Sequence, residues 1–142
     1  MREWKLLCEK TLEEDMISFS VTEDVNGDDF AVKELIVIVM ANTASKSQYL
    51  RIAANNKTGS IAYGKIVETS KKAAKLHAMI VAGKFMDVGS LFGNNEYSLS
   101  GMSSYGSIEG SNVGDEIREI TFSTNTGEPL LTSGSKYIVY GR

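Results

Sequence analysis

Stretches in which apolar and polar residues alternate recur along most of this chain. Successive side chains of a β-strand point to opposite faces, so a period of two predicts a strand with one buried face. In the first stretch, Trp4, Leu6 and Cys8 share an apolar face, and Lys5 and Glu9 share the other. The same alternation predicts strands over residues 4–9, 17–21, 49–54, 61–67, 117–122 and 137–140.

Residues 35–40, Leu-Ile-Val-Ile-Val-Met, are apolar at every position. A run that is this short and β-branched is typical of a central strand covered on both faces. In an all-β chain, cover on both faces means that the strand lies inside a sandwich or forms a subunit interface. The run is therefore a candidate interface.

Glycine and asparagine separate the predicted strands. The chain has 13 Gly and 1 Pro, and glycine between β-branched runs marks tight turns. Asn26-Gly27 is a favoured hairpin pair, because both residues tolerate a positive φ. Residues 55–59 and Ser133-Gly134 predict two further turns. Residues 11–15 have capping-box spacing, which is compatible with a single helical turn.

Residues 70–83 fit two periods. A helix is compatible with Ser70 as its cap, Gly83 as its stop and apolar residues on one face. The segment from Leu76 to Ala82 also alternates at period two. Because its neighbours are predicted strands, we favour a strand over about residues 75–86.

Residues 89–114 are rich in Gly, Ser and Asn, yet apolar residues are scattered among them. A flexible linker would lack these apolar residues. One interpretation is a set of short edge strands joined by tight turns. The other is a long loop that presents Phe92, Tyr97 and Tyr105 to a ligand or a neighbouring subunit.

These patterns predict one all-β domain over residues 1–142. Turn signals recur every 10–15 residues or so, and no segment is a clear helix, which favours an antiparallel β-sandwich of about eight strands. A chain that closes on a paired strand ties its last residues into a sheet, so we expect residues 136–140 to be held firmly.

Composition narrows the function classes. The chain has 142 residues, a formal net charge of −3 and a pI near 5.2, so no basic field is expected to hold nucleic acid. No apolar run approaches the roughly 18–20 residues that span a bilayer, so membrane insertion is not expected. The polar start does not resemble a signal peptide. Cys8 is the one cysteine and has no partner for an internal disulfide.

The sequence has few candidate metal-ligating or catalytic residues. Asp24, Asn26 and Asp28 have alternating oxygen ligands, but Asp29 and Leu35 stand where a calcium-binding EF-hand loop requires Gly and Glu. A polar turn is the better interpretation, and weak calcium binding with Asp29 as a further ligand stays open. The single histidine, His77, has no second ligand at zinc spacing. Cys8 lies on an apolar face and is expected to be packed. We expect no cofactor and no enzymatic activity.

The two ends of the chain carry motifs in a recognisable order. Near the start are Trp4, Leu12-Glu13-Glu14-Asp15 and Asp24-Val25-Asn26-Gly27, and near the end is Gly134-Ser135-Lys136-Tyr137-Ile138-Val139-Tyr140-Gly141. Together they resemble a family of bacteriophage and prophage structural proteins. The resemblance covers about the first 40 and the last 25 residues.

The resemblance implies a non-enzymatic virion component with a jelly-roll-like sandwich, such as a head-fibre, tail or baseplate protein. It implies assembly in the bacterial host cytoplasm, contacts with other virion proteins, and a homo-oligomer, with a trimer favoured. The alternative is a carbohydrate-binding module. The two functions are compatible, because phage fibres recognise glycans on the host surface. Its platform would be Phe92, Tyr97 and Tyr105 with Tyr63, and its hydrogen-bonding partners would be Asn94, Asn95 and Glu96.

Overall fold

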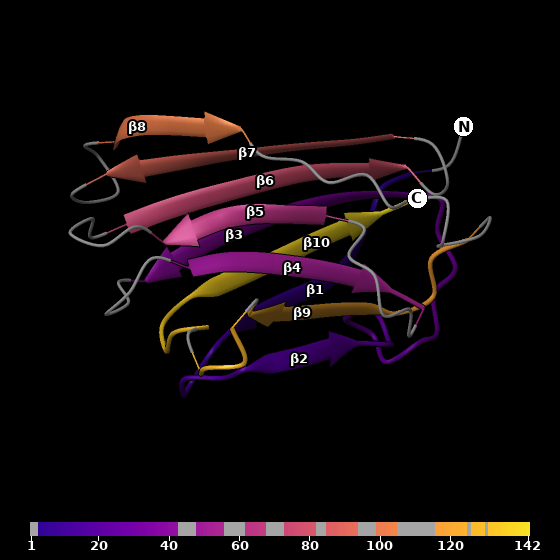
Figure 1. The fold of residues 1–142 in the computed structure, drawn as a ribbon. Coiled ribbons are helices and arrows are strands. Elements are labelled where there is room, and N and C mark those ends of the chain that lie inside the picture. The colour runs from indigo at the N-terminus through magenta and orange to yellow at the C-terminus, as the bar shows by residue number, and fades with distance from the viewer. Residues whose placement is uncertain are drawn as a thin grey trace.

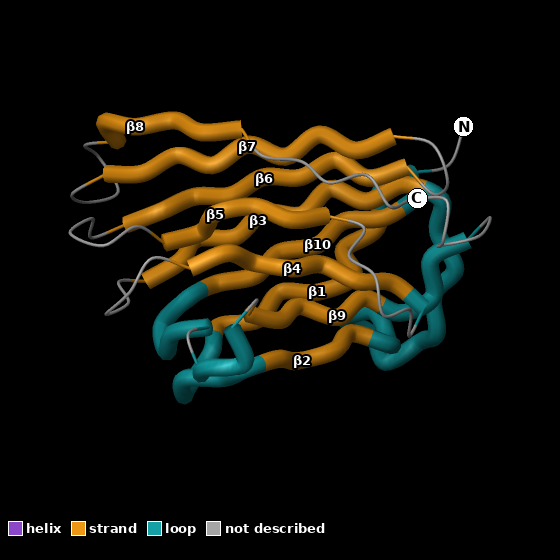
Figure 2. Tube along the Cα trace, in the orientation of Figure 1, coloured by secondary structure: helices purple, strands orange, loops and turns teal. Residues whose placement is uncertain are grey.

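The structure, a computed structural model, describes residues 3–42, 48–55, 62–67, 73–81, 85–93, 99–104, 116–124, 126–129 and 131–142. In 41–49 and in the strands between 62 and 104, only the backbone is described. The described residues form strands and loops and no helix (Figure 2). Accordingly, no helix among them is long and apolar enough to cross a membrane.

Ten strands form two antiparallel sheets in the described part of the chain (Figure 1). A six-stranded sheet, the large sheet, has the order β1-β10-β3-β6-β7-β8, and a four-stranded sheet, the small sheet, has the order β2-β9-β4-β5. The strands are β1 (Lys5–Thr11), β2 (Ser18–Val21), β3 (Glu34–Asn42), β4 (Gln48–Ala54), β5 (Ala62–Val67), β6 (Ala73–Val81), β7 (Phe85–Gly93), β8 (Leu99–Ser104), β9 (Ile120–Thr124) and β10 (Lys136–Gly141).

The two sheets pack face to face around one apolar core, which confirms the predicted all-β sandwich. Period-two alternation is plain in β9 and β10, whose inward side chains are buried and whose outward ones are more exposed. Across the interface, the ring of Tyr137 in the large sheet meets those of Phe19 and Phe122 in the small sheet, at centroid distances of 4.9 Å and 5.1 Å. Edge-to-face contact of this kind adds to the area buried.

Strand β1 departs from the predicted alternation. A bulge lies between Leu6 and Cys8, so Leu7 and Cys8 are both buried, at 1% and 8% exposure, while Leu6 stays half-buried. The expected shared face of Trp4, Leu6 and Cys8 is therefore wrong. A bulge places two residues against one on the partner strand, and it changes which side of the sheet the following side chains occupy.

Strand β3 is covered on one face and partly covered on the other. Leu35, Val37 and Val39 face the small sheet and are fully buried. Ile36 and Ile38, on the opposite face, are only half-buried. The expectation of complete burial on both faces thus holds for the inner face alone within a single chain.

The segment that fitted both helix and strand is strand β6, Ala73–Val81, so the favoured interpretation is confirmed. Its expected extension to residue 86 is wrong, because Val81 pairs with Phe85 and Ile80 with Met86, so the chain reverses between them. The Gly-rich region contributes the outermost strands of the large sheet, the end of β7 and all of β8, which lie at the top of Figure 1. Residues 89–93 and 99–104 are therefore strands, of which β8 alone lies at the edge of the sheet, because β7 pairs on both sides. The described part of the chain holds ten strands, where about eight were expected.

Loops at two places differ from expectation. Residues 11–15 form no helical turn, because the Leu12 amide donates to the Ser135 carbonyl at 2.9 Å and its carbonyl accepts from Gly134 at 2.8 Å. At Asn26-Gly27, only Gly27 has a positive φ, +82°. The Gly27 amide donates to the Asp24 carbonyl at 3.0 Å, so the turn begins at Asp24.

Strand β10 is paired on both sides, with β1 and with β3, so the prediction of a firmly held final strand is confirmed. Beyond it, the Arg142 carbonyl accepts from the amides of Lys33 and Glu34 at 2.8 Å and 3.0 Å, and the Arg142 amide donates to the Glu34 carbonyl at 3.1 Å. These bonds position the residues around Arg142 against the β2–β3 connection.

Candidate functional site

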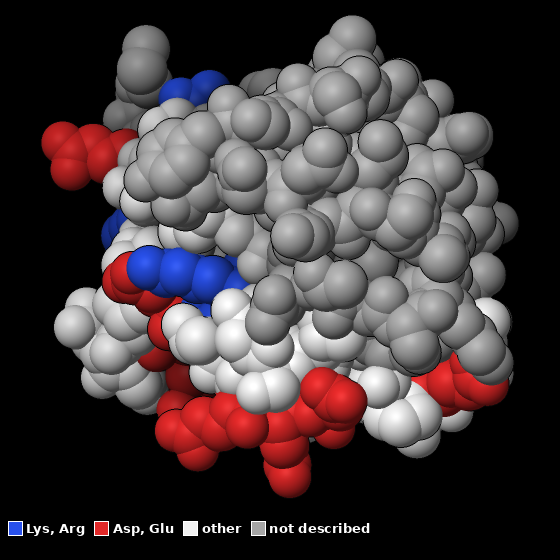
Figure 3. Space-filling model, turned by 90° about the vertical axis from the view of Figure 1, so that its left-hand side faces the viewer, with Lys and Arg blue, Asp and Glu red and all other residues white. Residues whose placement is uncertain are grey.

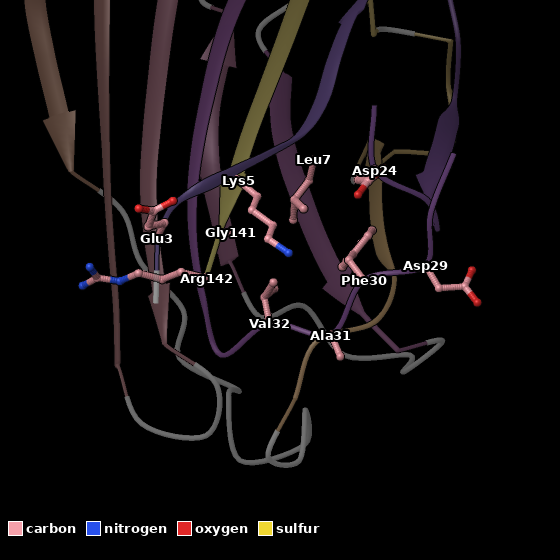
Figure 4. Close-up of a pocket in the computed structure, with 10 residues that line it drawn as sticks. All are labelled: Glu3, Lys5, Leu7, Asp24, Asp29, Phe30, Ala31, Val32, Gly141 and Arg142. Carbon is pink, nitrogen blue, oxygen red and sulfur yellow. The ribbon is translucent and has the colours of Figure 1, made fainter. Parts of the chain in front are cut away.

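A hollow of about 430 Å³ opens at the end of the sandwich where β1 begins and β10 ends (Figure 4). Three segments that are far apart in sequence build it: the start of β1, the β2–β3 connection and the end of β10. Its lining residues are Glu3, Lys5, Leu7, Asp24, Asp29, Phe30, Ala31, Val32, Gly141 and Arg142.

The β2–β3 connection owes its shape to a small set of local hydrogen bonds. Asp24 Oδ1 accepts from the amides of Asn26 and Asp28 at 2.8 Å and 3.1 Å, and the Asp24 amide donates to the Asp28 carbonyl at 2.8 Å. An Asp that bonds the backbone two residues on is typical of a tight turn. The turn sets the following segment across the end of the sandwich, where Phe30 and Val32 are buried.

Gly141 lets the floor of the hollow close tightly. A Cβ at this position would lie 2.6 Å from Leu7 Cδ1 and 3.0 Å from Val32 Cγ1. Both neighbours belong to the core, at 1% and 5% exposure, so neither has room to move. The three residues thus form a compact apolar floor that admits no larger side chain at position 141.

The rim of the hollow is charged. In Figure 4 the Lys5 ammonium points inward between Leu7, Val32 and Phe30, whereas Arg142 and Asp29 extend away. Lys5 makes no ion pair with a residue that the structure describes. The Arg142 side chain has partners outside the hollow: it forms an ion pair with Glu34, and its Cζ lies 4.3 Å from the centroid of the Trp4 ring. The arrangement combines an apolar floor with one inward cation, which suits a small polar ligand.

A second hollow, of about 420 Å³, adjoins the first, because Asp29 and Phe30 line both. Asn55, at the end of β4, forms part of its wall. The Asn55 side chain donates to the Glu116 carbonyl at 2.7 Å and accepts from the Arg118 amide at 2.7 Å. It holds this bridging position at a φ of +55°. Asn55 therefore clamps the segment before β9 onto the small sheet.

The Asp24–Asp28 loop behaves as the predicted polar turn, since Asp24 uses one carboxylate oxygen to hold the turn itself. Within the part of the chain that the structure describes, no three His, Cys, Asp or Glu side chains are placed to share a metal ion. Asp24, Asn26 and Asp28 thus stand as a turn in this structure.

Cys8 is packed, as expected. It is 8% exposed, and burial raises the pKa of its thiol above the ordinary value, an effect that nearby Lys10 partly offsets. A buried thiol with a raised pKa is a poor nucleophile at neutral pH. His77 lies in β6, in register with Ile38 on β3.

Of the residues that the sequence singled out as possible ligand-binding residues, Asp24 and Asp29 line the first hollow. Phe92 lies within β7, in register with Ala74 and Gly101, and Tyr63 lies in β5. Tyr97 and Tyr105, like Asn94, Asn95 and Glu96, lie outside the described residues. Lys5, Phe30 and Asn55 also line the hollows. They were not selected from the sequence, because they come from segments that are far apart along the chain.

The opposite end of the sandwich carries a different charge. Its described surface, which faces the viewer in Figure 3, shows more red carboxylate than blue cation. The β1–β2 connection there holds the exposed Glu13, Glu14 and Asp15, and Asp15 Oδ1 accepts from the Ser133 amide at 2.8 Å. Among the residues that the structure describes, that end is therefore acidic, and the end with the hollows has mixed charge.

No protein-family model matches this chain, and a search of curated proteins finds none of similar sequence.

Proposed function

We propose that this chain is a non-enzymatic structural module of a bacteriophage or prophage particle, that it folds as a jelly roll, and that it acts by assembling with copies of itself and with other virion proteins. The observation that carries the proposal is the strand order of the two sheets. Jelly rolls are eight-stranded double-sheet folds found in viral capsid and lectin domains.

The strand order has the form that a jelly roll requires. In that fold, the first, last, third and sixth strands form one sheet, and the second, seventh, fourth and fifth form the other. Here β1-β10-β3-β6 pair in this order in the large sheet, and β2-β9-β4-β5 pair in this order in the small sheet. The remaining strands, β7 and β8, extend the large sheet beyond β6 as an inserted hairpin.

The motifs at the two ends of the chain supply the link to phage particles. They fall on β1 and its connection to β2, on the turn that begins at Asp24, and on β10, which are elements of this jelly-roll framework. As a particle component, the chain would be made and assembled in the cytoplasm of the bacterial host. Self-association follows from this role, and a trimer is the number that the resemblance implies.

Size-exclusion chromatography with light scattering tests the assembly role. We expect the purified chain to elute as a stable homo-oligomer at micromolar concentration, with a mass that is a small multiple of 15.5 kDa. A mass of three subunits would favour a fibre-like particle component. A chain that remains monomeric at 100-fold higher concentration would remove the support for self-assembly.

The second candidate function is glycan binding, and the hollow beside Lys5 is the observation that favours it. An apolar floor next to a polar rim is a common design for small-ligand sites, and lectins share the jelly-roll fold. A glycan array probed with the oligomer should then give signal that Lys5→Ala abolishes. An array without signal would leave assembly as the role.

A further inference from the structure

The two sheets present very different surfaces on their outer sides. Among the described side chains of β2, β9 and β4 in the small sheet, those that point away from the core are mostly polar: Ser18, Ser20, Arg51, Ala53, Thr121 and Ser123. Ser20 and Thr121 hydrogen-bond across β2 and β9 at 2.8 Å. An antiparallel sheet with one face in water is expected to look like this.

The outer side of β1, β10 and β3 in the large sheet is mostly apolar. Tyr140 is in register with both Leu6 and Ile36, and Ile138 is in register with Ile38, so these side chains adjoin. All are partly accessible, and Tyr140 reaches 36% exposure. We name this surface the outer apolar face: Leu6, Ile36, Ile38, Met40, Ile138 and Tyr140.

Charged residues at both ends of the outer apolar face cancel each other. At one end, Lys136 Nζ lies 2.9 Å from Glu9 Oε1. At the other, Arg142 pairs with Glu34. The face thus carries no net charge to attract a strongly acidic or basic partner, and two copies of it would meet without repulsion.

The edge of the large sheet at β1 is poorly suited to adding a strand from another chain. The bulge between Leu6 and Cys8 interrupts its ladder, and Lys5, Glu9 and Lys10 place exposed charges along it. Bulges and charges are the usual means by which proteins block pairing at a sheet edge. Contact through the face is therefore favoured over contact through this edge.

The area of the outer apolar face is that of three strands. At a spacing of about 4.8 Å and lengths of roughly 20–30 Å, β1, β10 and β3 cover roughly 290–430 Å². Standard interfaces take about 800 Å² from each partner, and transient ones take less than about 600 Å², so this face is at the small end of the range. A second copy of the same three strands offers a face of equal size that is likewise neutral and apolar.

We propose that the outer apolar face of one chain packs against the same face of a second copy, sheet on sheet, around a two-fold axis. This proposal rests on the assembly function above and names the surface that performs it. Two flat apolar sheets pack at a spacing of about 10 Å, as they do inside a sandwich. The contact would leave both Ser/Thr-rich outer faces in water.

Charge-introducing variants test the surface. Ile38→Lys and Tyr140→Lys each place an ammonium in the proposed contact, twice per pair of copies because of the two-fold axis. We expect each to raise the dissociation constant at least about 100-fold, because an unpaired buried charge is strongly unfavourable. Ser18→Lys, on the outer side of the small sheet, is the matched control and should assemble like the wild type. Sedimentation velocity gives the subunit count, and far-UV circular dichroism checks that each variant folds.

The outcomes separate the two proposals. Folded monomers of both face variants, beside an oligomeric control, would support the outer apolar face as the contact. If both face variants form oligomers with wild-type affinity, the outer apolar face is not the contact, and the proposed assembly function still holds. A monomeric wild type would overturn both, and a trimeric wild type would overturn the two-fold contact alone. Tyr140→Lys keeps the test decisive if Ile38→Lys fails to fold, since Tyr140 is already exposed in the single chain.

Discussion

Tyr137 has opposing effects on stability, because both its ring and its hydroxyl are buried. Its side chain is fully buried between the two sheets, and its hydroxyl has no hydrogen-bond partner. Burial raises the pKa of this hydroxyl far above its ordinary value of 10.0, because the ionised form would lose its hydration. The ring stabilises the core through Phe19 and Phe122, while the hydroxyl opposes it.

Replacing Tyr137 with Phe should therefore stabilise the protein. Loss of a buried, unpaired hydroxyl is worth about 1 kcal/mol at neutral pH, and the ring contacts remain. Above about pH 10 the difference in stability between the variant and the wild type should increase. Tyr137 loses its proton there in the unfolded state but keeps it in the folded state, so the wild type loses stability as pH rises. Urea titrations at pH 7, 9 and 10.5 measure both effects.

A Tyr137→Phe protein that is less stable than the wild type at pH 7 would mean that the hydroxyl has a partner, such as a buried water.

At the scale of elements, β10 is the centre of the large sheet's hydrogen bonding, because it pairs with β1 on one side and β3 on the other. Amide exchange in a buried, doubly paired strand requires opening of much of the fold. We expect the amides of β10 and β3 to exchange most slowly and those of the exposed residues 13–15 to exchange much faster. Hydrogen exchange followed by NMR measures this, and rapid exchange at Val139 would contradict it.

Elements with strict alternation could be predicted from the sequence, and those that break it could not. Residues 137–140 were predicted to alternate between two faces, and they do so because nothing interrupts their period. Leu7 was missed because a bulge shifts the period by one residue. The reversal between Val81 and Phe85 was missed because apolar residues lie on both sides of it and Gly83 was considered only as the end of a helix.

For the whole molecule, a single core shared by both sheets should make unfolding cooperative. Trp4, the one tryptophan, lies against Arg142 at the start of β1, whereas far-UV circular dichroism reports on the strands of both sheets. We expect Trp4 fluorescence and circular dichroism to give the same urea midpoint. Distinct midpoints would mean that the chain has two independently stable parts, contrary to the single domain predicted.

The hollow could not be predicted from the sequence at this scale. Lys5, Phe30 and Gly141 come from three segments, and only the antiparallel pairing of β1 with β10 brings the first and the last together. Part of the outer apolar face could be predicted from the sequence, because residues 35–40 are apolar at every position. Its full extent depends on register, which places Ile138 and Tyr140 beside them.

The extra residue in β1 shifts the alternation of inward and outward side chains by one position along that strand. Before it, even-numbered positions such as Leu6 look outward; after it, odd-numbered positions such as Glu9 do so. Deleting Leu7 would keep Leu6 opposite Tyr140 and Glu9 opposite Ile138 in an unbroken ladder, but it would remove a buried side chain from the core beside Gly141. Homologous chains that lack this residue could keep the outward-facing pairs and would have to fill the space beside Gly141 with another side chain.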